Sequence, residues 1–499
     1  MSTNKLLLLY IGLTFLTFAL GEFRDNKSVM MVVDKLGDLS IFWIAHKEEQ
    51  DKCKVNPTKY NFNSDQKGNI SYDRTTFTTG VVLKDMILVC GGLIDLNSAK
   101  TGTNQSQPDF KLTQHPSNKC WYWHRDEPPA SLKLLGKESS IPISEDDMDP
   151  GAKGQVLMAS TFTNGNYVKD KFEFYVLVLA TFDGIKSKKY RRHFFGGKID
   201  PRCVNGTIPS TSGRRAVLKK GVEFEYNKDL QQSSNGTINK KCTPTVSWTT
   251  LTPPNWDNDH GIEFPCVVYY GKHFIVLGVS KDIRMPEWGA MVYDSENDTW
   301  NNFALPGYPK IKLPGRPRNN FACGIYRNNL MFSGGIYSFD PKEEVRSVAN
   351  DTHLFNIRYY KEGNFWNPQY KVASMDDGNG KDCEVCPLWS HTIAIIQDIN
   401  REVMFAAFGC TDNPCHGNNK IYQYDQTYGM TQGKWVIVRD SPNFNKYYRT
   451  HIGLTIPMTW IQDCADENNG SIIKLHAIMQ IMIVFVVHCL FLHLIASDL

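Results

Sequence analysis

The feature that most constrains this fold is a degenerate repeat of short apolar segments. Each unit opens with a polar-to-apolar segment, passes a turn, and continues into an apolar run that ends at one or two glycines. An aromatic segment and a tryptophan follow. The clearest unit runs from Arg318 to Gly335, and others occupy 74–92, 260–278, 391–409 and, less clearly, 156–184. Because each unit supplies three or four short strands separated by turn residues, the sequence predicts an all-β fold.

Two segments, NNLMFSGG (328–335) and MVYDSENDTW (291–300), resemble the kelch repeat. That resemblance implies a single β-propeller in which each repeat of about 50 residues forms one four-stranded blade. A glycine pair suits the end of an apolar strand, because glycine permits positive φ and close approach of neighbouring backbone. The tyrosine and tryptophan side chains are expected to pack between blades.

The leftover segments at the two ends predict how the ring closes. Residues 449–457 resemble the opening strand of a sixth unit, whereas 28–48 resemble later strands without an opening. Pairing the two would remove exposed sheet edges, so we predict six kelch-like blades over residues 22–465, with seven as the alternative. Cys53 and Cys464 flank these segments and are candidates to staple the closure. A multi-domain β-sandwich protein is the runner-up fold.

The uneven spacing of the units predicts long inserted loops at 97–118, 131–154 and 185–216. The third holds a basic run from Lys186 to Arg192, with five cations in seven residues. We interpret it as a solvated loop balanced by the acidic stretch 145–149. Binding of a sulfated glycan or an acidic lipid surface is the alternative.

The N-terminus has the pattern of a secretory signal peptide over residues 1–21. Lys5 precedes an apolar run, and Ala19 and Gly21 provide small residues for cleavage before Glu22. A retained N-terminal membrane anchor is the alternative.

The C-terminus has the pattern of a glycosylphosphatidylinositol (GPI) attachment signal. Residues 477–496 are apolar enough to cross a bilayer, yet no Lys or Arg follows them. Small residues precede this tail, so we predict a spacer at 466–476 and lipid attachment at Asn469, with Asn468 next. A retained transmembrane helix and a secreted form are the alternatives.

Cysteines and glycosylation sequons indicate an oxidising compartment. Of 13 cysteines only Cys489 lies in the tail, so its removal leaves an even number able to pair. The disulfide candidates are Cys53, Cys90, Cys120, Cys203, Cys242, Cys266, Cys323, Cys383, Cys386, Cys410, Cys415 and Cys464. A zinc or redox site at Cys383 and Cys386 is the alternative, and we expect no metal. N-x-S/T sequons predict glycosylation at Asn26, Asn69, Asn104, Asn205, Asn235, Asn297 and Asn350, and an eighth sequon is at Asn469.

The charge balance and the sequence motifs argue against several classes of function. Lys and Arg number 55 and Asp and Glu 52, a balance that argues against nucleic-acid binding. The sequence has no nucleophile elbow, phosphate loop, H-E-x-x-H or EF-hand pattern. It also lacks the clustered His and Tyr typical of galactose-oxidase-like propellers and the full repeated turn of sialidase-like ones. We therefore expect no enzyme and no cofactor, with a secreted copper oxidase or glycan hydrolase as the alternative.

Basic residues recur near the start of successive units, at Arg74, His260, Arg318, His391 and Arg449. In a kelch-like ring the innermost strands line the central channel, so these residues are candidates for a basic rim that binds an anionic or carbohydrate ligand. The alternative is that they bond to carbonyls and turns between blades. The sequence thus predicts a binding or adhesion glycoprotein on the extracellular side of the plasma membrane. Its partner is an unknown protein or glycan, and a lipid anchor or a single C-terminal span attaches it to the membrane.

Overall fold

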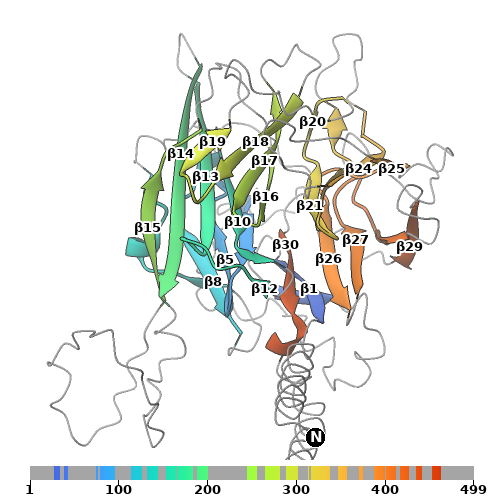
Figure 1. Ribbon diagram of the computed structural model, residues 1–499, viewed down its shortest axis with the longest axis horizontal. Coiled ribbons are helices and arrows are strands. Elements are labelled where there is room, and N and C mark those ends of the chain that lie inside the picture. The colour runs from blue at the N-terminus through green and yellow to red at the C-terminus, as the bar shows by residue number, and fades with distance from the viewer. Residues whose placement is uncertain are drawn as a thin grey trace, which may run out of the picture.

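A computed structural model gives the architecture of the chain (Figure 1). The residues it describes are 27–33, 39–42, 75–76, 79–95, 114–125, 132–143, 153–163, 166–183, 188–200, 244–254, 265–280, 288–301, 313, 316–337, 347–356, 370–374, 387–398, 401–411, 416–425, 434–440 and 452–461. Over these residues the elements are β-strands and two short 3₁₀ helices, η1 (Lys137–Ser139) and η8 (Met458–Trp460). The prediction of an all-β fold is confirmed.

Six antiparallel sheets form the blades of a propeller, each described here from its innermost strand outward. Blade 1 contains β4 (Thr79–Val82), β5 (Met86–Cys90), β8 (Cys120–His124) and β9 (Lys133–Leu134). Blade 2 contains β10 (Lys153–Ser160), β13 (Phe174–Asp183), β14 (Lys188–Asp200) and β15 (Thr245–Leu251). Blade 3 contains β16 (Cys266–Tyr270), β17 (His273–Ser280), β18 (Trp288–Asp294) and β19 (Thr299–Asn301).

The remaining blades continue the same order. Blade 4 contains β21 (Ala322–Tyr326), β22 (Asn329–Ser333), β24 (Asp351–Asn356) and β25 (Tyr370–Ser374). Blade 5 contains β26 (Thr392–Asp398), β27 (Arg401–Ala407), β28 (Lys420–Asp425) and β29 (Lys434–Asp440). Blade 6 contains β30 (Ile452–Pro457), β1 (Ser28–Val33) and β2 (Leu39–Phe42). Smaller sheets are β3 (Thr75–Thr76), β6 (Leu93–Asp95) and β7 (Gln114–Pro116); β11 (Phe162–Thr163) and β12 (Asn166–Tyr167); and β20 (Arg318–Asn319) and β23 (Ile336–Tyr337).

Blade 6 contains strands from both ends of the described chain. β1 pairs antiparallel with β30, with Ser28 opposite Pro457 and Val33 opposite Ile452. The two strands lie side by side in Figure 1, as the sequence predicted. The innermost strands contact one another in the order β4, β10, β16, β21, β26 and β30, and β30 in turn contacts β4. The prediction of six blades is confirmed.

An apolar cluster fills each junction between neighbouring blades. On β1, Val29, Met31 and Val33 pack against blade 1, whereas Met30 and Val32 pack against blade 5. Side chains alternate along a strand, so each blade buries both faces and its central strands read as nearly continuous apolar runs. Aromatic side chains pack between blades as expected. Tyr293 and Trp300 lie between blades 2 and 3, and Trp435 lies between blades 4 and 5.

The glycine pairs have the conformation that the repeat predicted. Gly334 and Gly335 follow β22 with φ values of 60° and 99°. A Cβ on Gly335 would lie 2.8 Å from the carbonyl oxygen of Asn319, so the close approach requires glycine. In blade 5 the equivalent pair is Phe408 and Gly409, at φ 62° and 76°.

The structure differs from the sequence prediction at the insertions 131–154 and 185–216. Within the first, β9 completes blade 1, and within the second, β14 is the third strand of blade 2. The basic run predicts a solvated loop at residues 188–192, whereas in the structure these residues pair with β13. Gly196 and Gly197, which had no role in the repeat, leave room on β14 for the rings of Phe172 and Phe174.

Two disulfides join described strands. Cys90–Cys120 links neighbouring strands within blade 1, and Cys266–Cys323 links the innermost strands of blades 3 and 4. Cys410 is also disulfide-bonded. The other candidates lie outside the described residues: Cys53, Cys203, Cys242, Cys383, Cys386, Cys415 and Cys464.

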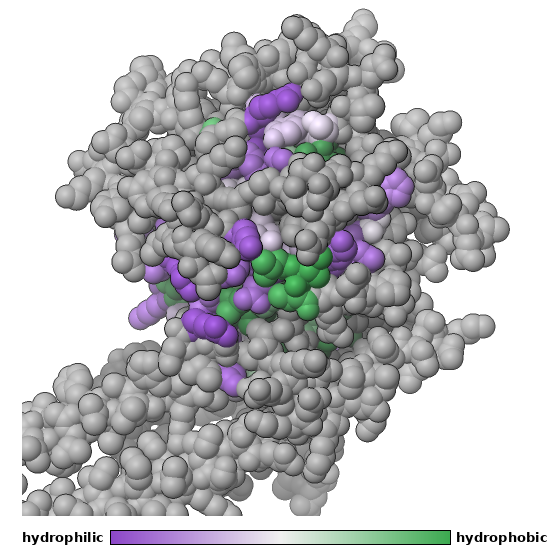
Figure 2. All heavy atoms as spheres, turned by 90° about the vertical axis from the view of Figure 1, so that its right-hand side faces the viewer, coloured by the Kyte–Doolittle hydropathy of each residue, from purple (hydrophilic) through white to green (hydrophobic). Residues whose placement is uncertain are grey.

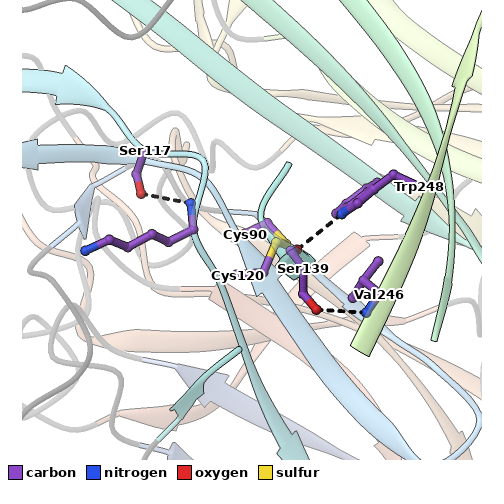
Figure 3. Close-up of a disulfide and its surroundings, with 7 residues drawn as sticks. Cys90, Ser117, Cys120, Ser139, Val246 and Trp248 are labelled. Atoms are coloured by element: carbon purple, nitrogen blue, oxygen red, sulfur yellow. Dashed lines mark hydrogen bonds between the residues drawn. A yellow bond between two sulfur atoms is a disulfide. The ribbon is translucent and has the colours of Figure 1, made fainter. Parts of the chain in front are cut away.

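Beside the first disulfide, η1 connects blades 1 and 2 (Figure 3). The Val246 backbone N–H donates to the Ser139 hydroxyl at 2.9 Å, and the Trp248 indole donates to the Ser139 carbonyl at 3.2 Å. The segment leaving blade 1 is therefore fixed to the outermost strand of blade 2.

Within the described part of the chain, no helix is both long and apolar enough to cross a membrane. The predicted signal peptide, spacer and apolar tail (1–21, 466–476 and 477–496) lie outside the described residues.

Candidate functional site

The ring has two unlike faces. The face where the innermost strands begin, here called the upper face, carries the glycine pairs and the small sheets β3–β6–β7 and β20–β23. At the opposite, lower face the innermost strands end, and tight turns join several of them to the second strand, as at 271–272 and 327–328. In Figure 1 β20 lies at the top and β1 toward the bottom.

Of the five predicted basic residues, the structure describes Arg318 and His391. Both lie at the upper face, just before the innermost strands of blades 4 and 5. They meet at Gly334, whose carbonyl oxygen accepts a hydrogen bond from Arg318 Nη1 at 3.3 Å. A Cβ on this glycine would lie 2.9 Å from Cε1 of His391. The other three, Arg74, His260 and Arg449, lie outside the described residues.

Arg318 forms a buried ion pair rather than an exposed rim. Its side chain is 0% exposed and donates to both carboxylate oxygens of Asp351, with Nη2 at 3.0 Å from Oδ2. The same Oδ2 lies 2.8 Å from Nε2 of His353. Burial alone would raise the pKa of Asp351, but the hydrogen bonds from His353 and Arg318 outweigh it and hold the pKa well below its ordinary value.

Packing around this ion pair is dense. The ring of His353 stacks on Phe332, with centroids 4.9 Å apart. Next to it, the Thr352 hydroxyl lies 2.8 Å from the hydroxyl of Ser333 and accepts a hydrogen bond from the Trp435 indole at 3.1 Å. Trp435 belongs to blade 5, so this bond fixes the opposite face of β24 to the neighbouring blade.

Above the ion pair, an exposed arginine lies on a tyrosine ring. The guanidinium of Arg316 is 4.8 Å from the Tyr337 ring centroid, and that of Arg318 is 5.2 Å from the same centroid. Burial and the nearby Asp351 raise the pKa of Tyr337, so its phenol is neutral at physiological pH. We call Arg316 and Tyr337 the upper-face pair. A guanidinium held in this way suits recognition of a carboxylate, sulfate or phosphate group.

Arg316 is not among the residues that the repeat predicts. It lies two residues before Arg318, in the segment RPRNN, outside the basic position that recurs in successive units. Only the pairing of Arg318 with Tyr337 between β20 and β23 brings the tyrosine next to it.

A matched arginine–tyrosine contact lies at the lower face of the same blade. The guanidinium of Arg327 is 5.2 Å from the Tyr326 ring centroid, in the exposed turn between β21 and β22. Its backbone N–H donates to Glu402 of blade 5 at 2.5 Å. This contact has the same arginine–tyrosine arrangement as the upper-face pair but lies at the opposite face, which makes Arg327 a suitable control.

A second polar network joins blades 2 and 3 near the lower face. The Ser295 hydroxyl donates to both carboxylate oxygens of Asp170, at 3.2 and 3.1 Å. The Tyr175 hydroxyl donates to Asp170 at 3.4 Å, and that of Tyr293 donates to Asp298 at 2.6 Å. Burial is the main cause that raises the pKa of both tyrosines. These bonds lie within a packed aromatic cluster, so we assign them to the blade junction.

A patch of apolar residues lies on one side of the ring (Figure 2). Figure 2 views the molecule from the side where Figure 1 places β25 and β29, and the apolar residues among those described gather in a central patch with hydrophilic residues around it. On β29, Val438 is 41% exposed.

Two predicted glycosylation sites are described. Asn297 is exposed in the turn between β18 and β19 at the lower face, and its amide donates to Asp294 at 3.0 Å. Asn350 is half-buried at the upper face, directly before Asp351. The sequons at Asn26, Asn69, Asn104, Asn205, Asn235 and Asn469 lie outside the described residues.

No protein-family model matches the chain, and a search of curated proteins found no match either. Among the described residues, no group of three His, Cys, Asp or Glu side chains is arranged to hold a metal ion. The fold and site thus define a disulfide-bonded, six-bladed β-propeller, and its likeness to kelch repeats stays a resemblance.

Proposed function

We propose that this chain is an extracellular, membrane-attached recognition glycoprotein that uses the upper face of its propeller to bind an anionic group on a protein or glycan partner. The observation that carries the proposal is the upper-face pair, an exposed guanidinium on a tyrosine ring above a buried ion pair. Loops and short segments on a rigid scaffold are where recognition concentrates in proteins.

The cost of burying the ion pair supports a role for it in binding as well as in stability. Moving two charges out of water is costly, and well-packed apolar residues in their place often give equal or greater stability. Arg318 and Asp351 lie beneath the exposed guanidinium and fix β20 against β24. A fixed binding group loses less conformational entropy when a ligand binds, and the rigid pair therefore favours affinity.

The cysteines and sequons support the extracellular part of the proposal. Disulfides persist in oxidising compartments, and Cys90, Cys120, Cys266, Cys323 and Cys410 are all disulfide-bonded. The sequon at Asn297 is exposed on a turn, where a glycan fits without disturbing the core. Lipid attachment at Asn469, or a retained span at 477–496, would then hold the propeller at the cell surface.

An array experiment tests the proposal. Residues 22–468 would be applied to glycans and cell-surface proteins that include matched acidic and neutral members. We expect binding to acidic members, at least tenfold weaker in Arg316→Ala and unchanged in Arg327→Ala; a tenfold loss corresponds to about 1.4 kcal/mol. Equal loss in both variants, or binding independent of Arg316, would contradict the proposed site.

The same preparation distinguishes recognition from catalysis. We propose that the chain binds its ligand without transforming it. Bound metal in the purified ectodomain, peroxide release from sugars, or cleavage of a glycan on the array would instead favour the copper oxidase or glycan hydrolase.

A further inference from the structure

Both ends of the propeller leave from the lower face. β1 begins at Ser28 and β30 ends opposite it at Pro457. Just beyond this pair, the backbone N–H of Met458 donates to the carbonyl of Lys27 at 2.9 Å. The chain therefore enters and leaves the ring at adjacent points on one face.

The exit point of the C-terminal chain is held in the core. Trp460 and Ile461 are 3% and 1% exposed. The Trp460 ring stacks on Phe162, with centroids 6.2 Å apart, and lies at the same distance from Trp123 of blade 1. Because Ile461 is fixed against the ring, the reach of the following chain can be measured from this residue.

That reach is limited. Asn469, the proposed attachment site, lies eight positions after Ile461, so a fully extended chain between them spans at most about 28 Å. The upper-face pair lies at the far end of the blade strands, which rise about 3.4 Å per residue, so the six residues of β30 span about 20 Å. Attachment at Asn469 thus tethers the chain where it leaves the lower face, and the upper face is offset from that point by the length of the strands.

We infer that the lower face is directed toward the membrane and that the upper-face pair is directed away from the cell, toward partners in the medium or on an opposing surface. This inference rests on the proposed membrane attachment. It deepens that proposal, because a site on the upper face is then open to an anionic partner in trans while the lipid surface lies beyond the opposite face.

Energy transfer on intact cells tests the orientation. The full chain would carry one small fluorophore, placed either at Lys84, exposed in a lower-face turn of blade 1, or at Ser347, exposed at the upper face of blade 4. The acceptor is a lipid dye in the outer leaflet. We expect stronger transfer from position 84 than from position 347. Equal transfer, or stronger transfer from position 347, would overturn the inference.

A phospholipase step separates this inference from the attachment proposal. Phosphatidylinositol-specific phospholipase C should release the protein and abolish transfer from both positions. If the protein stays on the cells, attachment at Asn469 is wrong, and the inference is overturned with it even if position 84 transfers more strongly, because the limit of about 28 Å no longer applies. If the protein is found only in the medium, both the membrane attachment and the orientation are overturned. Unchanged thermal unfolding of the two labelled variants is the control for folding.

Discussion

Among the described residues, a network at the upper face and one near the lower face bury polar groups that are compensated in different ways. At the upper face of blade 4, Arg318 and Asp351 are both charged groups, and each depends on the other for compensation. Near the lower face, the hydroxyl of Ser295 in blade 3 donates to Asp170 in blade 2. The comparison teaches that a hydroxyl bond is lost at modest cost, whereas removing one member of a buried ion pair strands a charge.

The largest expected effect comes from breaking the ion pair. Asp351→Asn leaves the fully buried guanidinium of Arg318 without its carboxylate, and we expect the free energy of unfolding to fall by about 3–5 kcal/mol. Denaturant unfolding of the purified ectodomain measures this loss.

A double replacement is the control for the ion pair. Combining Arg318→Met with Asp351→Leu removes both charges, so stability should return most of the way to that of wild type. If Asp351→Asn is as stable as wild type, the upper network does not depend on charge compensation.

A smaller loss is expected at the lower network. Tyr293→Phe removes the hydrogen bond to the carboxylate of Asp298 and should cost about 1.5–3 kcal/mol, measured by the same unfolding. Tyr270→Phe is the matched control, because the Tyr270 hydroxyl bonds to Asn328 at the exposed surface. If Tyr270→Phe lowers the free energy of unfolding as much as Tyr293→Phe does, burial does not explain the contribution of the lower network to stability.

The two networks should also lose their contributions to stability at opposite ends of the pH scale. The folded-state pKa of Asp351 is lowered, so its stabilisation is complete above the unfolded value of about 3.9 and declines as the pH falls below it. The pKa values of Tyr175 and Tyr293 are raised, so their stabilisation is present below about pH 10 and declines as the pH rises further. Unfolding measured against pH should show the acid loss reduced in the double replacement at 318 and 351, and the alkaline loss reduced in Tyr293→Phe.

The smallest effect on stability is expected from the predicted glycosylation site at the lower face. Asn297→Gln removes an exposed glycan acceptor and the 3.0 Å hydrogen bond that its amide donates to Asp294. The free energy of unfolding should therefore change by less than about 0.5 kcal/mol. The secreted protein should nevertheless migrate faster in a gel by the mass of one glycan. Unaltered migration would show that this turn carries no glycan.

The repeat predicted the blades because strand pairing and inter-blade packing depend on local patterns. The positive φ at Gly334 and Gly335 and the burial of Trp435 both follow from residues within one unit. The strand at 188–200 was missed because its first residues are basic, and pairing with β13 outweighed their polarity.

The site was less predictable than the blades. Asp351 lies 33 residues from Arg318, and only the sheet topology brings the two side chains together. Likewise, the contact between Arg316 and Tyr337 depends on the short β20–β23 pairing, for which the repeat gives no signal.

Hydrogen–deuterium exchange with the tightest binder from the array tests most directly that recognition takes place at the upper face. Amides at 334–337 and 347–351 surround the upper-face pair, whereas those at 294–299 and 326–329 lie in lower-face turns. We predict that the ligand slows exchange in the first two segments and leaves the other two unchanged. Protection confined to the lower-face turns would contradict the account.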